Sequence, residues 1–110
     1  ITDVPFTTVN SSHLAYLRNL NLSGCKNISD ATVKELAKCD GLHDLNLSGC
    51  ELVTSASIIK LVKRCQALRT LNIFGCKLVG DDVVKQIQSS HSLERVFTVN
   101  TGIKKSLSKH

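Results

Sequence analysis

The sequence contains no methionine or tryptophan and few aromatic residues: its 110 residues include one tyrosine, three phenylalanines and a single proline. A globular core of this size usually uses more large rings, because aromatic side chains bury a large area each. Stacked repeats do without them, since each repeat buries aliphatic side chains against its neighbours. A complete translation product starts with methionine, so we expect this chain to be a fragment or a processed product.

Long apolar runs are also missing. No run approaches the roughly 18 residues that a membrane-spanning helix requires. The start, Ile1-Thr2-Asp3, has neither the basic nor the apolar part of a secretory signal. Hydrophobic residues make up 42% of the chain and charged residues 21%, as in ordinary soluble domains. The sequence therefore predicts a domain without a membrane segment.

One line of residues recurs along the chain. Residues 42–50 read Leu-x-x-Leu-x-Leu-x-x-Cys, and the same pattern begins at Leu17 and Leu68, with a degenerate copy at Leu93. The first leucines of these copies lie 25, 26 and 25 positions apart. A fixed period in this range indicates stacked repeats, in which each line forms a β-strand.

The segments between these lines have the periodicity of short helices, with apolar residues at i, i+3 and i+4. Ser29 is placed to cap the first helix, and Asp30 lies in its first turn, where a negative charge is favourable. Thr54 takes the capping position in the next repeat. We expect helices near residues 30–39, 55–64 and 81–89, and parallel strands near 20–22, 45–47 and 71–73.

The two ends are less regular than the middle. In the last line Thr98 and Thr101 replace an aliphatic residue and the cysteine, so a register slip that buries Phe97 and Val99 remains an alternative. The predicted fold is α/β: a short right-handed solenoid with parallel strands on the concave face and helices on the convex face. Its parts are a partial repeat at 1–16, repeats at 17–41, 42–67 and 68–92, a terminal strand at 93–103, and a disordered basic tail at 104–110.

The five cysteines fall into two repeat positions: Cys25, Cys50 and Cys76 end the strand lines, whereas Cys39 and Cys65 precede the next line. Repeat position explains them without disulfides or metal, because an odd count without a Cys-x-x-Cys pair argues against both. We expect the first three to be buried, reduced thiols, each beneath a bend made by the preceding glycine. Reduced thiols favour a cytoplasmic or nuclear location.

The consensus Leu-x-x-Leu-x-Leu-Ser-Gly-Cys, followed by Ile-Ser-Asp-x-x-Val-x-x-Leu-Ala-x-Cys, resembles the cysteine-containing class of leucine-rich repeat over about residues 17–92. That class is familiar from F-box/leucine-rich-repeat proteins and from proteins like the antagonist of mitotic exit network. The resemblance implies a protein-binding arc, which in F-box members is the substrate-receptor arm of a cullin-RING ubiquitin ligase. A free-standing adaptor, or a structural segment of a longer solenoid without its own partner, remains the alternative.

No catalytic, cofactor or metal site stands out. The histidines share no motif with a cysteine or serine, and no glycine-rich loop resembles a phosphate cradle. The net charge is +5, but no aromatic residues interleave with the lysines to stack nucleic-acid bases. We therefore expect a monomer that binds a protein, with no enzyme activity, no cofactor and no nucleic-acid partner.

The residues between the leucines of each strand line should point away from the core and form the binding face. They change from small polar residues in the first two repeats to Phe and Arg in the last two, so Phe74 beside Arg69 and Arg95 resembles a binding hot spot. Alternatively, Phe74 folds onto Phe97 and shields the final strand. The predicted partner-binding residues are Asn19, Asn21, Asp44, Asn46, Arg69, Thr70, Asn72, Phe74, Arg95 and Phe97.

Overall fold

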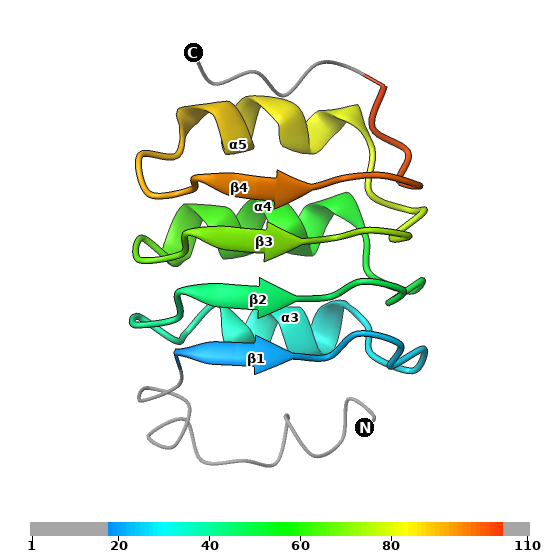
Figure 1. The fold of residues 1–110 in the computed structure, drawn as a ribbon, viewed down its shortest axis with the longest axis horizontal. Coiled ribbons are helices and arrows are strands. Elements are labelled where there is room, and N and C mark those ends of the chain that lie inside the picture. The colour runs from blue at the N-terminus through cyan, green and yellow to red at the C-terminus, as the bar shows by residue number, and fades with distance from the viewer. Residues whose placement is uncertain (1–17, 105–110) are drawn as a thin grey trace.

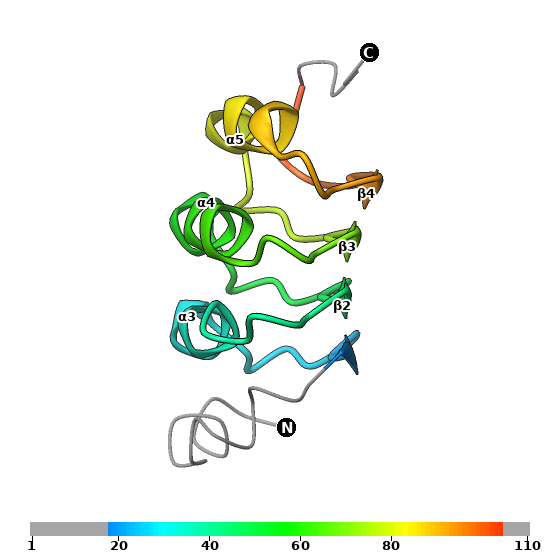
Figure 2. The ribbon, with the colours of Figure 1, turned by 90° about the vertical axis from the view of Figure 1, so that its left-hand side faces the viewer.

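A computed structural model describes residues 18–104 of the chain (Figure 1). Its strands form a parallel sheet in sequence order, and helices connect them along one side (Figure 2). The strands are β1 (Asn19–Asn21), β2 (Asp44–Asn46), β3 (Thr70–Asn72) and β4 (Arg95–Phe97). The connections contain α3 (Asp30–Leu36), α4 (Ser55–Arg64), a 3-10 turn η1 (Asp81–Val83) and α5 (Val84–Ser89). This arrangement confirms the predicted α/β leucine-rich-repeat solenoid; the predicted partial repeat at 1–16 lies outside the described residues.

The predicted element bounds need small corrections. The second helix is as predicted, but the first ends at Leu36, because Lys38 N and Cys39 N bond to carbonyls three residues back and tighten the chain. The third helix opens as the 3-10 turn η1. Each of the three predicted strands begins and ends one residue earlier than expected.

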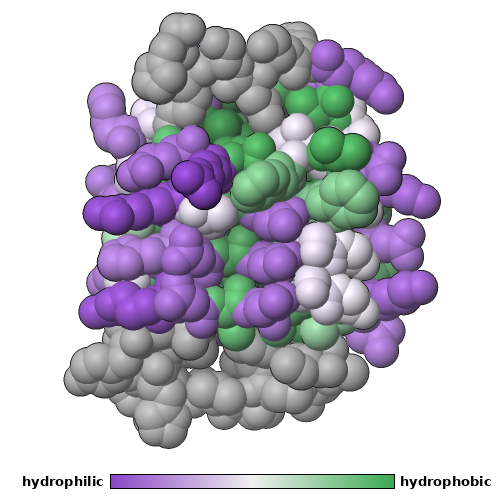
Figure 3. Space-filling model, viewed as in Figure 1, coloured by the Kyte–Doolittle hydropathy of each residue, from purple (hydrophilic) through white to green (hydrophobic). Residues whose placement is uncertain are grey.

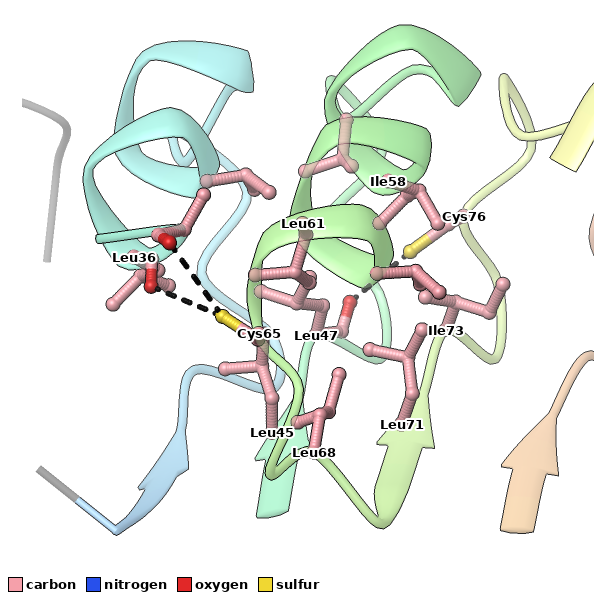
Figure 4. Close-up of a cluster of buried hydrophobic side chains, with 14 of the residues drawn as sticks. Leu36, Leu45, Leu47, Ile58, Leu61, Cys65, Leu68, Leu71, Ile73 and Cys76 are labelled. Atoms are coloured by element: carbon pink, nitrogen blue, oxygen red, sulfur yellow. Dashed lines mark hydrogen bonds between the residues drawn. The ribbon is translucent and has the colours of Figure 1, made fainter. Parts of the chain in front are cut away.

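The core lies between the sheet and the helices, where the leucines of each strand line stack on those of the next (Figure 4). Leu45 and Leu71 pair in register across β2 and β3 and are at most 1% exposed. Leu47 and Ile73, two residues further along each strand line, are completely buried. Aliphatic ladders of this kind need no aromatic residue, which accounts for the composition of the chain.

Buried thiols complete the contact between neighbouring repeats. Cys50 Sγ donates to Leu22 O at 3.3 Å, and Cys76 Sγ donates to Leu47 O at 3.1 Å, in each case in the preceding repeat. The Cys65 thiol lies against the carbonyl oxygens of Leu36, Ala37 and Cys39, at 3.6–3.7 Å. Figure 4 shows Cys65 pointing to the end of α3 at Leu36. All five cysteines are free. Burial of Cys50 and Cys76 is confirmed, whereas the prediction for Cys25 was wrong: Cys25 is only partly buried, although it packs against the core.

The turn after each of the first three strands has one construction. The side-chain oxygen of the strand-end asparagine accepts from the N–H two residues on, as Asn46 Oδ1 does from Ser48 N at 2.9 Å. The glycine that follows has a positive φ, which is 78° at Gly49. A side chain there would be strained. The predicted glycine bend is therefore confirmed, and the asparagine is a second part of it. The equivalent residues are Asn21 and Gly24 after β1, and Asn72 and Gly75 after β3.

The last strand keeps the register of the others, so the alternative slip is wrong. Val96 pairs with Leu71 and points inward, while Phe97 and Val99 are 48% and 64% exposed. Asn100 has φ 62° and occupies the glycine position, as asparagine can. The Thr101 hydroxyl donates to Thr98 O at 2.7 Å and accepts from Ile103 N at 3.2 Å.

Acidic and hydroxyl side chains join the helix starts of successive repeats. Ser29 caps α3 as predicted, accepting from Ala31 N at 3.4 Å. Asp30 does more than stabilise its own helix, because it accepts hydrogen bonds from Thr54 N, the Thr54 hydroxyl and the Ser57 hydroxyl. Thr54 is the N-terminal cap residue of α4, but its side chain makes no capping bond and turns to Asp30 instead.

The same position recurs in the next two repeats. Ser55 Oγ accepts from Gly80 N at 2.8 Å, and Asp81 Oδ1 accepts from Lys104 N at 2.6 Å. Lys104, which the sequence analysis assigned to the tail, thus has its backbone bound to the last repeat. Residues 105–110 of the predicted tail lie outside the described residues.

Candidate protein-binding face

The predicted binding residues lie in rows across the sheet, because the strands pair without any offset. One row is Asn19, Asp44, Thr70 and Arg95, and the next is Asn21, Asn46, Asn72 and Phe97. Both rows are on the face turned away from the buried leucines. The first three members of each row are polar and uncharged, apart from Asp44. The last strand replaces them with a cation and an aromatic ring.

A shallow depression of about 350 Å³ lies over this face and is lined by residues from all four strands. Seven of the ten predicted residues line it, together with Leu20 and Leu45; these are Asn19, Asn21, Asp44, Asn46, Thr70, Asn72 and Phe97. Arg69, Phe74 and Arg95 lie outside its lining. The sequence pattern thus found the sheet face and most of the depression.

The asparagine row has a structural role that limits what it offers a partner. The carbonyl oxygens of Asn21, Asn46 and Asn72 already accept from backbone N–H groups, at 2.9–3.0 Å. Their amide nitrogens donate no hydrogen bond within residues 18–104 and are the groups best placed to contact a ligand.

Exposed hydrophobic side chains gather beyond the carboxyl ends of the strands. Phe74, Phe97 and Val99 are 44%, 48% and 64% exposed, and we call these three residues the apolar cluster. Phe74 and Val99 are held side by side because Gly75 N donates to Val99 O at 2.9 Å and Ile73 N to Phe97 O at 3.0 Å. Figure 3 shows hydrophobic side chains over this region and hydrophilic ones along the border where the strands begin.

Sequence reasoning named Phe74 and Phe97 as binding residues, and it placed Val99 among the residues that point away from the core without including it in the binding set. The signal that identifies it is its place two residues after Phe97, equivalent to Phe74 after Asn72. The solvent exposure of Phe74 is confirmed. Two more large hydrophobic side chains are exposed in the loops after β2 and β3. They are Leu52 and Leu78, which are 50% and 57% exposed and occupy equivalent positions two residues after Cys50 and Cys76.

The amino-terminal border of the sheet is charged. Arg69 Nε lies 3.9 Å from Glu94 Oε2, with both side chains more than 60% exposed. A pair this exposed contributes little to stability. Arg95 makes no ion pair with any other residue in the 18–104 range, so its guanidinium is available to an acidic group on a partner.

The ionisable groups inside the repeats serve the fold. Burial raises the pKa of Asp30, but hydrogen bonds from Ser57 and Thr54 outweigh it and hold that pKa below its usual value. Burial raises the pKa of Cys50 to about 11 and that of Cys65 and Cys76 to about 12, so these thiols are protonated and unreactive at neutral pH. Over residues 18–104, no three His, Cys, Asp or Glu side chains lie close enough together to hold a metal ion.

Comparisons with known proteins agree with this architecture. Residues 13–37 match the family described as Leucine Rich repeat. A solved structure described as the tropomodulin C-terminal domain from Caenorhabditis elegans is similar, with a TM-score of 0.54 and 14% identity, covering 79% of this chain and 78% of that one. No curated protein sequence matches significantly. None of the helices within 18–104 is long and apolar enough to cross a membrane. At this identity the likeness to the solved structure establishes the leucine-rich-repeat fold alone.

Proposed function

We propose that this leucine-rich-repeat chain is a protein-binding module whose partner docks on the sheet face at its C-terminal end. Repeats of this class generally mediate protein–protein interaction. The observation that carries the proposal is the exposed apolar cluster of Phe74, Phe97 and Val99, with Arg95, which makes no ion pair within residues 18–104, two residues before Phe97. Exposed aromatic rings next to arginine are the residue types favoured at binding hot spots.

The shape of the face supports a partner with mixed chemistry. Phe97 lines one side of the depression over the sheet, and Arg95, two residues earlier on β4, lies on the same face. A partner that places an apolar side chain on the cluster therefore brings a neighbouring acidic group close to Arg95. Charges in such a position guide orientation and association rate.

The wider role follows from the resemblance to F-box/leucine-rich-repeat proteins. Within the proposal, the arc serves as the substrate-recognition arm of a cullin-RING ubiquitin ligase, and a free-standing adaptor is the alternative. The two are separated by a pull-down with the intact gene product. Recovery of a cullin-RING adaptor together with the partner supports the ligase arm, whereas recovery of the partner alone supports the adaptor.

The binding face itself is tested with paired variants in the same pull-down. Phe74→Ala should weaken partner binding by about 2 kcal/mol if the ring is a hot spot, with little effect on folding because the ring is exposed. Lys63→Ala, on the exposed side of α4, is the matched control. Loss of the partner with Lys63→Ala but not with Phe74→Ala would transfer the site to the helical face and end the proposal.

A further inference from the structure

A second surface of this molecule carries a concentrated positive charge. A groove of about 230 Å³ runs between α3 and α4, on the side opposite the sheet face. Four of the six residues that line it are cations; the lining consists of Lys34, Glu35, Ala37, Lys38, Lys60 and Arg64. With one carboxylate among them, the net charge of the lining is +3.

The four cations form two columns. Lys34 lies on α3, Lys38 follows just past the end of that helix, and Lys60 and Arg64 are one turn apart on the neighbouring helix α4. Side chains one turn apart on a helix lie about 6 Å apart on one face. Ala37, whose short side chain is 2% exposed, also lines the groove.

The fold uses this positive charge only in part. Lys38 Nζ lies 3.3 Å from Glu35 Oε2, but the lysine side chain remains 54% exposed. The positive charge of Lys34 helps to lower the pKa of Asp30, but its influence on that carboxyl is smaller than those of burial and the hydrogen bonds. Arg64 lies in the last turn of α4, where a cation favours the helix dipole. Each of these stabilising roles involves a single cation, so none of them explains why both columns border the same groove.

We infer that this groove binds an acidic segment of a partner protein, with carboxylates one helical turn apart that lie between the two columns. Extended contact suits the site better than a single phosphate does, because its donors are exposed side chains on long stems and no backbone amide cradle encloses them. An anionic membrane fits less well, since the large exposed hydrophobic side chains described within 18–104 all lie at the sheet's carboxyl edge or in its loops. No aromatic ring lines the groove to stack a nucleic-acid base.

The probe for this site is a fluorescent, helix-forming peptide with glutamates at i and i+4, measured by fluorescence anisotropy with the whole chain. A peptide of the same composition with the glutamates scrambled is the second probe, and a single-stranded oligonucleotide of equal charge is the competitor. We expect the ordered peptide to bind about tenfold more tightly than the scrambled one, and its affinity to fall as salt is raised.

Charge-reversal variants locate the site. The double variant Lys38→Glu with Arg64→Glu should weaken binding of the ordered peptide by about tenfold or more, because it places repulsive charge in both columns. Lys85→Glu reverses one charge on α5, outside the groove, and is the control. It should weaken binding of the ordered peptide by less than about twofold. The unfolding midpoint of each variant, measured in parallel, identifies any loss that is due to misfolding.

Three outcomes would overturn the inference. Equal binding of the ordered and scrambled peptides would show that only net charge matters. An equal loss with Lys85→Glu would place the effect outside the groove. Tighter binding of the oligonucleotide than of the ordered peptide would assign the groove to a nucleic acid instead.

Discussion

The turn after β4 follows the same path as the turns after β1, β2 and β3, but other side chains hold it. In the first three turns a strand-end asparagine accepts from the backbone and a glycine supplies the positive φ. In the last, Asn100 has the positive φ and the Thr101 hydroxyl makes the turn's hydrogen bonds. Because the turn no longer depends on the strand-end side chain, that position is free to hold Phe97, an exposed ring.

This comparison separates two requirements that the repeat consensus combines. In the first three described repeats the strand-end residue is an asparagine whose side chain the turn itself uses. The last described repeat keeps the same backbone path, but different side chains hold its turn. The surface that we propose for a partner therefore lies where the consensus is least well kept.

The largest difference between the two regions is expected in the core. Leu71→Ala removes a completely buried side chain from an interior strand and should lower the free energy of unfolding by about 2–5 kcal/mol. Val96→Ala changes the half-buried residue that pairs with Leu71 on β4, and should cost about 1 kcal/mol. Urea unfolding followed by circular dichroism measures both. Equal losses would mean that β4 is packed as fully as the interior strands.

The junctions between helices should respond next. Asp30→Ala removes a carboxylate that accepts three hydrogen bonds from the following repeat, and should cost about 2 kcal/mol. Ser55→Ala, at the equivalent position, removes one neutral acceptor for Gly80 N and should cost about 1 kcal/mol. Urea midpoints at neutral pH give the ranking, and a larger loss for Ser55→Ala would contradict it.

The Asp30 junction also has a pH signature. Because the pKa of Asp30 in the folded chain lies below its ordinary value of 3.8, its contribution is complete above that value and is lost as the pH falls through the folded pKa. The parent chain should therefore lose stability on acidification below about pH 4, and Asp30→Asn should lose less over the same range. Identical acid profiles for the two chains would show that other carboxylates dominate.

Replacing the turn glycine is expected to lower the free energy of unfolding less than Leu71→Ala does, and about as much as a variant at a helix junction. Gly49→Ala places a side chain at φ 78° and should cost about 1–2 kcal/mol. Asn100→Gly puts the interior residue into the last turn and should change stability by about 0.5 kcal/mol or less, because asparagine already tolerates this conformation. Thermal unfolding of both variants measures the difference in stability. If Gly49→Ala costs less than about 0.5 kcal/mol, as expected for Asn100→Gly, the backbone of the turn relaxes to accept a side chain at this position.

The repeat period was sufficient to predict the architecture, since a leucine line every 25 or 26 residues fixes both the strands and the face they bury. Details that depend on contacts between repeats were not accessible in this way. Asp30 looked like a first-turn residue of its own helix, because nothing in the local pattern shows that Thr54 and Ser57 reach back to it. Val99 was left open for a similar reason: its exposure follows from the kept register of β4, which two threonines had made ambiguous.

The last prediction tests the chemistry of the cysteine position, where the expected effect is small. Cys50→Ser replaces a buried thiol that donates to Leu22 O at 3.3 Å, so the new hydroxyl has an acceptor at hand and should cost only about 1 kcal/mol. Cys50→Ala is the matched control, because it removes the donor altogether and should be no more stable than the serine variant.

The serine variant should also be less sensitive to alkali. Burial raises the pKa of the Cys50 thiol from its ordinary 9.0 to about 11, so its contribution is complete below pH 9 and is lost as the pH rises towards 11. Urea midpoints from pH 7 to pH 11 would show both effects. A serine variant less stable than the alanine variant would mean that the Leu22 carbonyl does not accept the hydroxyl, and that the slot is set by apolar packing alone.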